Sequence, residues 1–357
     1  MVPKLFTPGP VDLLPEISSA QGKPMLSHRG SEEYRQLQAR IIESIKKLLV
    51  CDEGIILTAS GTGGVEACVS SAILPGEAVL VPQNGIFGER LFEACAIHGA
   101  GAVGLKLDYG KGFSLERVKA EIDARKPAVL AMVLNETSTG VCNKAREICL
   151  YAKEKGALVI VDGVSGVGGH EFSMKVWGVD LCAVGSQKCI GAPPGLSVIG
   201  LSGVGAERVR KVKPRTRYFD LGKYLEFNAK SETPFTPAVS LMFGLDAAFS
   251  VLFKEGVDAR IERHKKAGEV ARRTLSEASF TLFAEEGFES NTVTSFAVSG
   301  EDEAGAVRKG VLRKGFEIAG GMGAMKGKVM RIGHMGNFSQ EDLMKCLRAI
   351  TSSGNRY

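Results

Sequence analysis

Lys188 and Asp162 are the two side chains of this sequence whose types and positions point most directly to a reaction. Asp162 follows the apolar run 157–161, and Lys188 ends the segment 185–188 after another predicted strand. A lysine amine can form a Schiff base with an aldehyde cofactor, and a carboxylate can pair with a protonated pyridine nitrogen, which makes the ring an electron sink. Taken alone, each is better explained as a surface lysine or a turn residue. Together, at the ends of two strands, they indicate a pyridoxal phosphate site.

The elements that must position these side chains alternate along the chain. The runs typical of strands are 54–58, 78–82, 101–107, 128–134, 157–161, 181–184 and 196–201. Apolar residues at three- and four-residue intervals predict helices at 31–49, 88–98, 115–125 and 144–155. This alternation predicts an α/β fold with a wound, mostly parallel sheet.

Three parts of the chain are expected. The proline-rich residues 1–14 should form an extended arm, and residues 15–254 a large cofactor-binding domain. Residues 255–357 have a different pattern and should form a smaller α+β domain. The elements expected there are a charged helix at 260–276, β-like segments at 281–283 and 292–298, and a final helix at 340–351.

Composition narrows the class of protein. An apolar content of 44% in 357 residues allows a large core, and no apolar run is long enough to span a membrane. We expect a cytoplasmic protein with no membrane contact. The net charge of +5 is modest, and the basic cluster 208–215 is better explained as a solvated face than as a nucleic-acid site. The eight scattered cysteines have no metal-ligand spacing, so no metal site is expected.

A glycine-rich segment at residues 60–64 separates a predicted strand from a predicted helix. Backbone N–H groups of Ser60, Gly61 and Thr62 in such a loop can bind a phosphate at the start of the helix. A simple tight turn explains the segment equally well. Neither the P-loop pattern nor the GxGxxG pattern is present, which argues against a dinucleotide-binding oxidoreductase.

Three further side chains lie in positions where they could contact a ligand. Phe87 follows a strand and could stack on a heteroaromatic ring, although a phenylalanine is more often part of the core. Thr137, in the segment 135–140, offers a hydroxyl after another strand, or is an ordinary cap or turn. Arg331 lies in an apolar, strand-like segment, where its guanidinium needs either a substrate carboxylate or a core carboxylate.

Eight short motifs occur in an order and spacing that form a family pattern. They are Thr7-Pro8-Gly9-Pro10, Ser27-His28-Arg29, SGTG at 60–63, ETSTG at 136–140, DGVS at 162–165, GSQK at 185–188, APPG at 192–195 and RIG at 331–333. With these motifs the chain resembles class V aminotransferases of pyridoxal-phosphate fold type I. The resemblance is strongest to the alanine–glyoxylate and serine–pyruvate branch, and it covers nearly the whole chain.

The resemblance implies a role for each motif residue. Lys188 would form the internal aldimine, Asp162 would pair with the pyridine nitrogen, and Phe87 would take the stacking place often held by tryptophan. Thr137 would lie near the cofactor's ring oxygen or Asp162. The remaining implied contacts are Ser60, Gly61, Thr62 and Gln187 to the cofactor, and Arg331 and Gly9 to the substrate.

The resemblance also implies a homodimer whose active sites lie near the subunit boundary. In such dimers a Tyr-x-x-Thr segment of the neighbouring subunit often completes the phosphate site, and here Thr236 would be its threonine. The tyrosine is absent, since position 233 is a threonine. Gly166 replaces the family's usual second serine after Asp162.

The implied reaction transfers an amino group from a small amino acid, of the alanine, serine or glycine type, to a small 2-oxo acid such as glyoxylate or pyruvate. The freed Lys188 amine would move a proton from the substrate's Cα to the cofactor's C4′ carbon. A single well-placed arginine suits a monocarboxylic substrate. Aspartate is less favoured because no second cation for its distal carboxylate is evident.

Other reactions on the same scaffold remain open. A 2-aminoethylphosphonate transaminase and a lyase acting on a hydroxy amino acid would use the same cofactor residues. A cysteine desulfurase needs a mobile cysteine before the carboxylate-binding arginine, whereas the only late cysteine, Cys346, follows Arg331. A non-catalytic binding protein that retains the fold is the alternative from another class.

Overall fold

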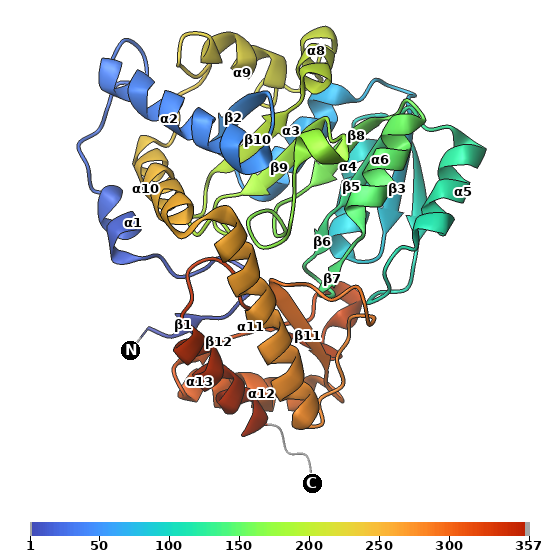
Figure 1. Ribbon diagram of the computed structural model, residues 1–357, viewed down its shortest axis with the longest axis vertical. Coiled ribbons are helices and arrows are strands. Elements are labelled where there is room, and N and C mark those ends of the chain that lie inside the picture. Colours follow the sequence, from blue (N-terminus) through green and yellow to red (C-terminus); the bar gives the residue numbers. More distant parts are fainter. Residues whose placement is uncertain (1, 354–357) are drawn as a thin grey trace.

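The centre of the structure is a seven-stranded sheet, which lies in the upper part of the molecule in Figure 1. The computed structural model describes residues 2–353. In spatial order the strands are β2 (Glu53–Leu57), β10 (Ser197–Leu201), β9 (Leu181–Gly185), β8 (Leu158–Asp162), β5 (Val129–Val133), β3 (Ala78–Gln83) and β4 (Gly101–Lys106). Neighbouring strands are parallel, except that β10 is antiparallel to both β2 and β9. The predicted wound, mostly parallel sheet is confirmed.

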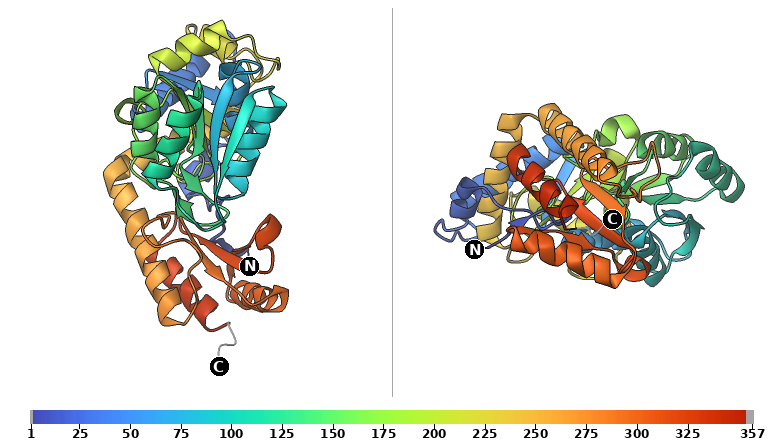
Figure 2. Two further views of the ribbon diagram at one scale, coloured as in Figure 1. Left: turned by 90° about the vertical axis from the view of Figure 1, so that its right-hand side faces the viewer. Right: turned by 90° about the horizontal axis from the view of Figure 1, so that it is seen from below.

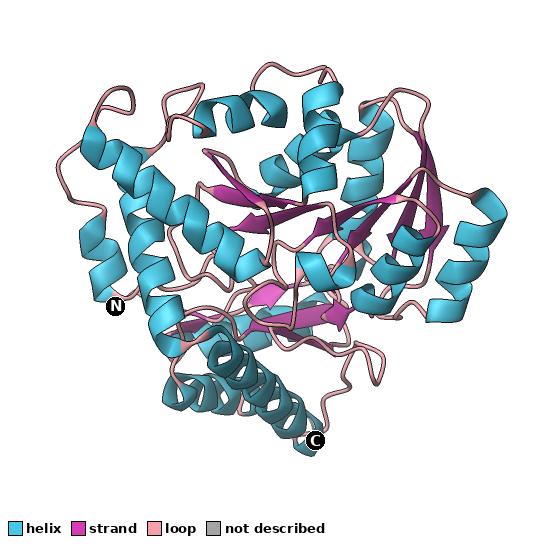
Figure 3. Ribbon diagram, turned by 45° about the horizontal axis from the view of Figure 1, so that its top comes forward, coloured by secondary structure: helices cyan, strands magenta, loops and turns pink. Residues whose placement is uncertain are grey.

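Helices cover both faces of this sheet (Figure 3). On β5, Leu130 and Met132 belong to one core cluster, while Val129 and Ala131 belong to the other. The first face is covered by α1 (Pro15–Ala20), α2 (Glu32–Leu49), α5 (Leu115–Arg125), α6 (Ala145–Glu154), α7 (Met174–Trp177) and α10 (Val239–Glu255). The second is covered by α3 (Gly61–Ala72), α4 (Ile86–Ile97), α8 (Gly203–Lys211) and α9 (Leu221–Asn228). Burial of both faces explains why the strands are continuously apolar.

From α11 (Val257–Glu277) onward the chain forms a smaller group of elements below the sheet (Figures 1 and 2). Its antiparallel sheet has the order β11 (Val293–Ala297), β14 (Val329–Gly333) and β13 (Ala319–Gly320). Its other elements are α12 (Glu301–Arg313), β12 (Phe316–Glu317), the 3-10 turn Gly323–Met325 and α13 (Gln340–Thr351). Gly256, with φ +90°, separates α10 from α11. The predicted division into an arm and two domains stays a prediction.

The N-terminal segment runs along these C-terminal elements. Strand β1 (Lys4–Leu5) pairs in parallel with β12. The Gly333 N–H donates a hydrogen bond of 2.6 Å to the Phe6 carbonyl, and the Phe6 ring is buried in the core of the smaller group. The first residues are therefore held by residues more than 300 positions later in the chain.

The C-terminal part differs from the expected elements at one helix. The expected β-like segment at 281–283 is short, since Leu282 forms an isolated antiparallel bridge with Phe296 of β11 before the backbone turns to Gly110. Helix α12 was not predicted, since its buried stripe is only Val307 and Val311. No helix within residues 2–353 has the length and apolar character needed to cross a membrane.

Candidate active site

One pocket of about 280 Å³ brings together three of the predicted site residues, Thr62, Phe87 and Asp162. Each comes from a different strand connection. Thr62 lies in the first turn of α3 after β2, Phe87 in the first turn of α4 after β3, and Asp162 ends β8. These strands run in one direction, so their carboxyl ends meet at the edge of the sheet where open α/β folds bind ligands.

Asp162 lines this pocket and is almost fully buried, with 8% of its surface exposed. Its Oδ1 accepts a hydrogen bond of 2.9 Å from the Val164 N–H. Burial raises the pKa of Asp162 to about 7, the nearby Glu136 raises it further, and Lys188 together with the Val164 N–H opposes the rise. A cation against this carboxyl would stabilise its ionised form, and the charge of a protonated pyridine nitrogen fits that requirement.

Lys188 lies just beyond β9, with its Nζ donating a hydrogen bond to the Pro8 carbonyl. Burial lowers the pKa of Lys188 to about 8, and Arg331 also lowers it, while Cys189 and Asp162 act in the opposite direction. Gly9 shapes the space around this amine. A Cβ on Gly9 would lie 2.5 Å from Lys188 Cδ and 2.7 Å from its Nζ, so a larger residue there would push the end of the lysine side chain out of this position.

The start of α3 offers an anion-binding group beside the Asp162 loop. Ser60 caps the helix, its Oγ accepting a hydrogen bond of 3.3 Å from the Gly63 N–H. The N–H groups of Gly61 and Thr62 have no partner within the helix, as is usual in a first turn. Gly61 packs closely on the next loop, since a Cβ there would be 2.8 Å from Val164 Cγ1. These N–H groups and the helix dipole together suit a phosphate.

Arg331 and Thr137 are joined directly, although 194 positions separate them in the chain. The Arg331 Nη1 donates to the Thr137 carbonyl at 3.0 Å, and its Nε and Nη2 donate to the Gly320 carbonyl at 3.0 and 2.8 Å. Burial lowers the pKa of Arg331 to about 10, with Glu136 opposing the shift. Among residues 2–353 its partners are carbonyls and not a carboxylate, so its charge is available to an anion. The Thr137 hydroxyl lies 2.6 Å from the Ser165 Oγ.

Glu136 is a site residue that sequence reasoning missed. It is fully buried, and its carboxylate accepts hydrogen bonds from the N–H groups of Phe87 at 3.3 Å and Gly88 at 3.0 Å, and from the Ser138 hydroxyl at 2.5 Å. Burial raises the pKa of Glu136, and these bonds oppose the shift. The glutamate thereby fixes the first turn of α4, which carries Phe87. Its only sequence signal was its place beside Thr137 in the motif at 136–140.

The two remaining predicted cofactor contacts lie differently. Gln187 has a buried side-chain oxygen that receives no hydrogen bond from residues 2–353. Leaving a buried oxygen without a hydrogen bond costs stability. A bound ligand could supply the missing donor, or the Gln187 amide could rotate and offer its NH₂ group to the ligand instead. Thr236 is exposed and does not line the pocket that contains Asp162.

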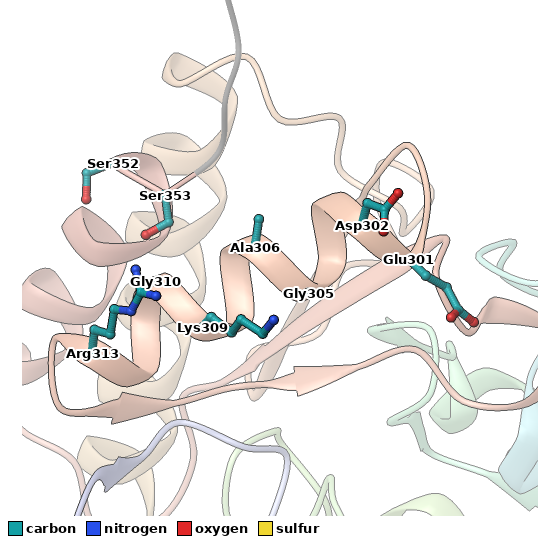
Figure 4. Close-up of a pocket in the computed structure, with 9 residues that line it drawn as sticks. All are labelled: Glu301, Asp302, Gly305, Ala306, Lys309, Gly310, Arg313, Ser352 and Ser353. Atoms are coloured by element: carbon teal, nitrogen blue, oxygen red, sulfur yellow. The ribbon is translucent and has the colours of Figure 1, made fainter.

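A second, larger pocket of about 580 Å³ lies between α12 and the end of α13 (Figure 4). Its walls include the exposed faces of Glu301, Lys309 and Arg313, together with Ser352 and Ser353. Figure 4 shows these side chains spread along one helix and the end of another, without a point on which they converge. None of the predicted site residues belongs to it.

Comparison with known proteins identifies the family. Residues 16–342 match the family model for aminotransferase class V. The chain belongs to the class V aminotransferase family. It is 34% identical to an uncharacterized aminotransferase of Methanocaldococcus jannaschii, over 97% of this chain and 91% of that protein. It is 31% identical to the L-aspartate–glyoxylate aminotransferase of Paracoccus denitrificans, over 94% of this chain and 87% of that protein.

A solved structure extends the comparison to the fold. The alanine–glyoxylate aminotransferase of a Nostoc species matches with a TM-score of 0.92 and 28% identity, covering 99% of this chain and 95% of that chain. The fold type I architecture expected for a class V aminotransferase is thereby confirmed. Within residues 2–353 of this class V aminotransferase, no group of three or more histidine, cysteine or acidic side chains is arranged to hold a metal ion.

Proposed function

We propose that this class V aminotransferase uses pyridoxal phosphate to move the amino group of a small amino acid to a small 2-oxo acid, with glyoxylate or pyruvate as the acceptor. The main support is the convergence of Thr62, Phe87 and Asp162 on one pocket. That pocket combines an anion-binding helix start, an aromatic ring and a buried carboxyl. A phosphate, a heteroaromatic ring and a pyridine nitrogen require this combination.

The chain's residues divide the work of holding the cofactor. Gly61, Thr62 and the amide of Gln187 would hold the phosphate, and Ser60 would keep the helix start in place. Phe87 would stack on the ring, and Asp162 would keep its nitrogen protonated. When bound, pyridoxal phosphate supplies an aldehyde that condenses with amines and a ring that accepts electrons.

Lys188 has two tasks in this scheme. It would hold the cofactor covalently, and once displaced by the substrate it would carry the proton that leaves the substrate's Cα. A pKa of about 8, caused mainly by burial, leaves part of the amine deprotonated at neutral pH. Gly9 and the Pro8 carbonyl would direct it. Thr137 would approach the cofactor's ring oxygen while bonded to Ser165.

Arg331 would bind the substrate's α-carboxylate. Its bonds to the Gly320 and Thr137 carbonyls fix the plane of the guanidinium without neutralising it. Relatives named for glyoxylate favour that acceptor, whereas their amino donors differ, with aspartate in one and alanine in another. We favour alanine, serine or glycine, because Arg331 is the one arginine that the motifs assign to a substrate carboxylate, and the pocket arginine Arg90 lies over the Phe87 ring at 5.3 Å.

The cysteine desulfurase alternative has little support. Burial raises the pKa of all eight cysteines, and none of them lines the pocket beside Asp162. A cysteine nucleophile needs exposure and a lowered pKa. A 2-aminoethylphosphonate transaminase and a lyase would share the cofactor residues, so substrate experiments must separate them from the proposed reaction.

Two measurements test the proposal. Protein mixed with pyridoxal phosphate should gain a visible absorption band, and borohydride should fix the added mass on the peptide that contains Lys188. Single half-reactions with alanine, serine, glycine, aspartate and 2-aminoethylphosphonate, followed through that band, should then rank the amino donors. A protein that stays colourless with added cofactor would be a binding protein with this fold and not the proposed enzyme.

The proposed homodimer and the role of Thr236 need a separate experiment. Sedimentation should give the mass of two chains. In that dimer the exposed Thr236 would complete the phosphate site of the neighbouring subunit. A Thr236→Val variant should therefore bind the cofactor more weakly while it still sediments as a dimer. A strictly monomeric protein with full cofactor affinity would contradict this part of the proposal.

A further inference from the structure

Arg260 is a fully buried arginine that contacts the segment directly after Lys188. It lies in the first turn of α11 and is 1% exposed. Its Nε and Nη2 donate to the Cys189 carbonyl at 2.9 and 2.7 Å, and Nη2 also reaches the Ile190 carbonyl at 3.4 Å. One guanidinium therefore holds two successive peptide groups of the lysine loop.

The Arg260 guanidinium is also bound by a carboxylate, on the nitrogen that does not contact the lysine loop. Its Nη1 donates to the Glu255 carboxylate at 2.6 Å, and Arg263 binds the same carboxylate at 2.6 Å through its Nε. Nearby, the Asn337 side chain donates to the Gly191 carbonyl at 2.8 Å. Side chains from α11 and from the loop after β14 thus bind three consecutive carbonyls of the lysine loop, those of residues 189 to 191.

Burying the Arg260 guanidinium costs desolvation free energy, so the hydrogen bonds that it makes need a reason beyond filling space. Desolvation lowers the pKa of Arg260, and the repulsion by Arg263 lowers it further, although Glu255 compensates in part. An apolar side chain of similar size would fill the same space at less cost. Only the planar fork of an arginine donates to two carbonyls and a carboxylate together.

We propose that Arg260 is a positioning residue for Lys188. By holding the peptide groups of Cys189 and Ile190, it fixes the direction in which the Lys188 side chain leaves the backbone and keeps its amine beside the Pro8 carbonyl. Its contacts with the lysine loop are to backbone carbonyls, so it would act through Lys188. The inference rests on the proposed function only where it concerns turnover, because the placement of the lysine itself can be measured without cofactor.

The decisive comparison uses two arginines of the same helix. Arg260→Met removes the fork but keeps the volume of the side chain, and Glu255 keeps its bond to Arg263. Arg272→Met is the matched control, because Arg272 also lies on α11 and donates to a backbone carbonyl, that of Ser290 at 2.9 Å, away from the lysine loop. Arg260→Lys keeps the charge without the fork.

The first readout is the pH dependence of acetic anhydride labelling at Lys188 in cofactor-free protein, followed by peptide mass spectrometry. Loosening the loop should expose Lys188 and raise its labelling pKa from about 8 toward the ordinary 10.5. The other groups that act on this amine are Cys189, which belongs to the lysine loop, and Arg331 and Asp162, which lie outside it. Arg260→Lys should shift in the same direction, which separates geometry from the loss of a charge.

The second readout is turnover of the cofactor-loaded enzyme. Since displacing a reacting group by about 1 Å costs on the order of 100-fold, kcat should fall by about that factor in Arg260→Met, with KM for the amino donor changed by less than about threefold. Arg272→Met should keep both constants close to wild type. If Arg260→Met does not fold, Asn337→Ala should give the same changes on a smaller scale through the Gly191 carbonyl.

The outcomes separate the two proposals. Wild-type protein that never links the cofactor to Lys188 refutes the proposed function, and the labelling profiles still decide the role of Arg260. If Arg260→Met matches Arg272→Met in both labelling and kcat, Arg260 is only structural and the inference is wrong. The same conclusion follows if Arg260→Lys and Asn337→Ala both match the wild type.

Discussion

Gly9 lies so close to Lys188 that a Cβ at position 9 would stand 2.5 Å from the lysine Cδ. Gly9→Ala should therefore displace the lysine side chain and weaken cofactor binding. Overpacking by about 1–3 kcal/mol corresponds to roughly 5- to 150-fold in the dissociation constant, measurable by titration of the visible band.

Gly30→Ala provides the control for this variant. Gly30 has a φ of +84°, nearly that of Gly9 at +83°, but a Cβ there would meet no atom within 4 Å. Both substitutions should lose roughly 1–2 kcal/mol of stability to the left-handed backbone, in thermal or urea unfolding. If the two variants bind the cofactor equally well, Gly9 is needed only for its left-handed backbone conformation and not for the space around Lys188.

Lys188→Ala should abolish the catalytic cycle. Loss of the proton-transfer group is expected to reduce kcat by roughly 10³-fold or more, measured by product formation with an excess of amino donor. Bound cofactor should no longer be fixed to the protein by borohydride. Transamination at the wild-type rate would rule out Lys188 as the cofactor lysine.

Asp162→Asn should affect cofactor-free and loaded protein in opposite ways. In cofactor-free protein, burial raises the pKa of Asp162 from 3.8 to about 7, so the folded state binds a proton more tightly than the unfolded state. Stability from this group is then present below pH 4 and is lost as pH rises toward 7. The variant should gain stability relative to wild type at pH 8, by up to about 4 kcal/mol, and little at pH 4.

Loaded protein should respond differently, because the ionised carboxyl then has a cationic partner. Asp162→Asn should weaken cofactor binding and slow each half-reaction, since the ring nitrogen loses its counterion. Urea unfolding at several pH values, with and without pyridoxal phosphate, measures both effects. A variant whose stability gain is independent of pH would contradict the buried, neutral state of Asp162.

Arg331→Lys should impair substrate binding and leave cofactor binding intact. Replacing a forked, charge-assisted contact by a single ammonium is expected to raise KM for the amino donor roughly 10- to 100-fold. Arg272→Lys is a suitable control, as this arginine also donates to a backbone carbonyl within the same group of elements. If KM for the amino donor is unchanged in Arg331→Lys, the substrate carboxylate binds somewhere other than Arg331.

Local patterns were sufficient to predict the main elements of the fold. The predicted helix 340–351 has the bounds of α13, and the helix at 115–125 has those of α5. Asp162 and Lys188 were recognisable because an apolar run marks each strand, with Asp162 directly after one run and Lys188 four residues after the other. Burial of such strands on both faces leaves a signal that single-sequence reading can detect.

Contacts between distant segments could not be predicted in this way. Glu136 binds the start of α4 from 48 residues away, and Arg260 reaches the lysine loop from 71 residues away. Neither lies at a spacing that a helix or strand would reveal. The β-like composition of the segment 281–283 likewise does not show that its pairing with β11 is limited to a single bridge.

The pairing of β1 with β12 has a consequence for how the protein matures during synthesis. The Pro8 carbonyl that meets Lys188 belongs to a segment anchored by residues 316–333. During synthesis that anchor is added long after both the Pro8 segment and Lys188. We therefore expect a nascent chain to capture its cofactor only once residues up to 333 have left the ribosome, however early the central sheet has folded.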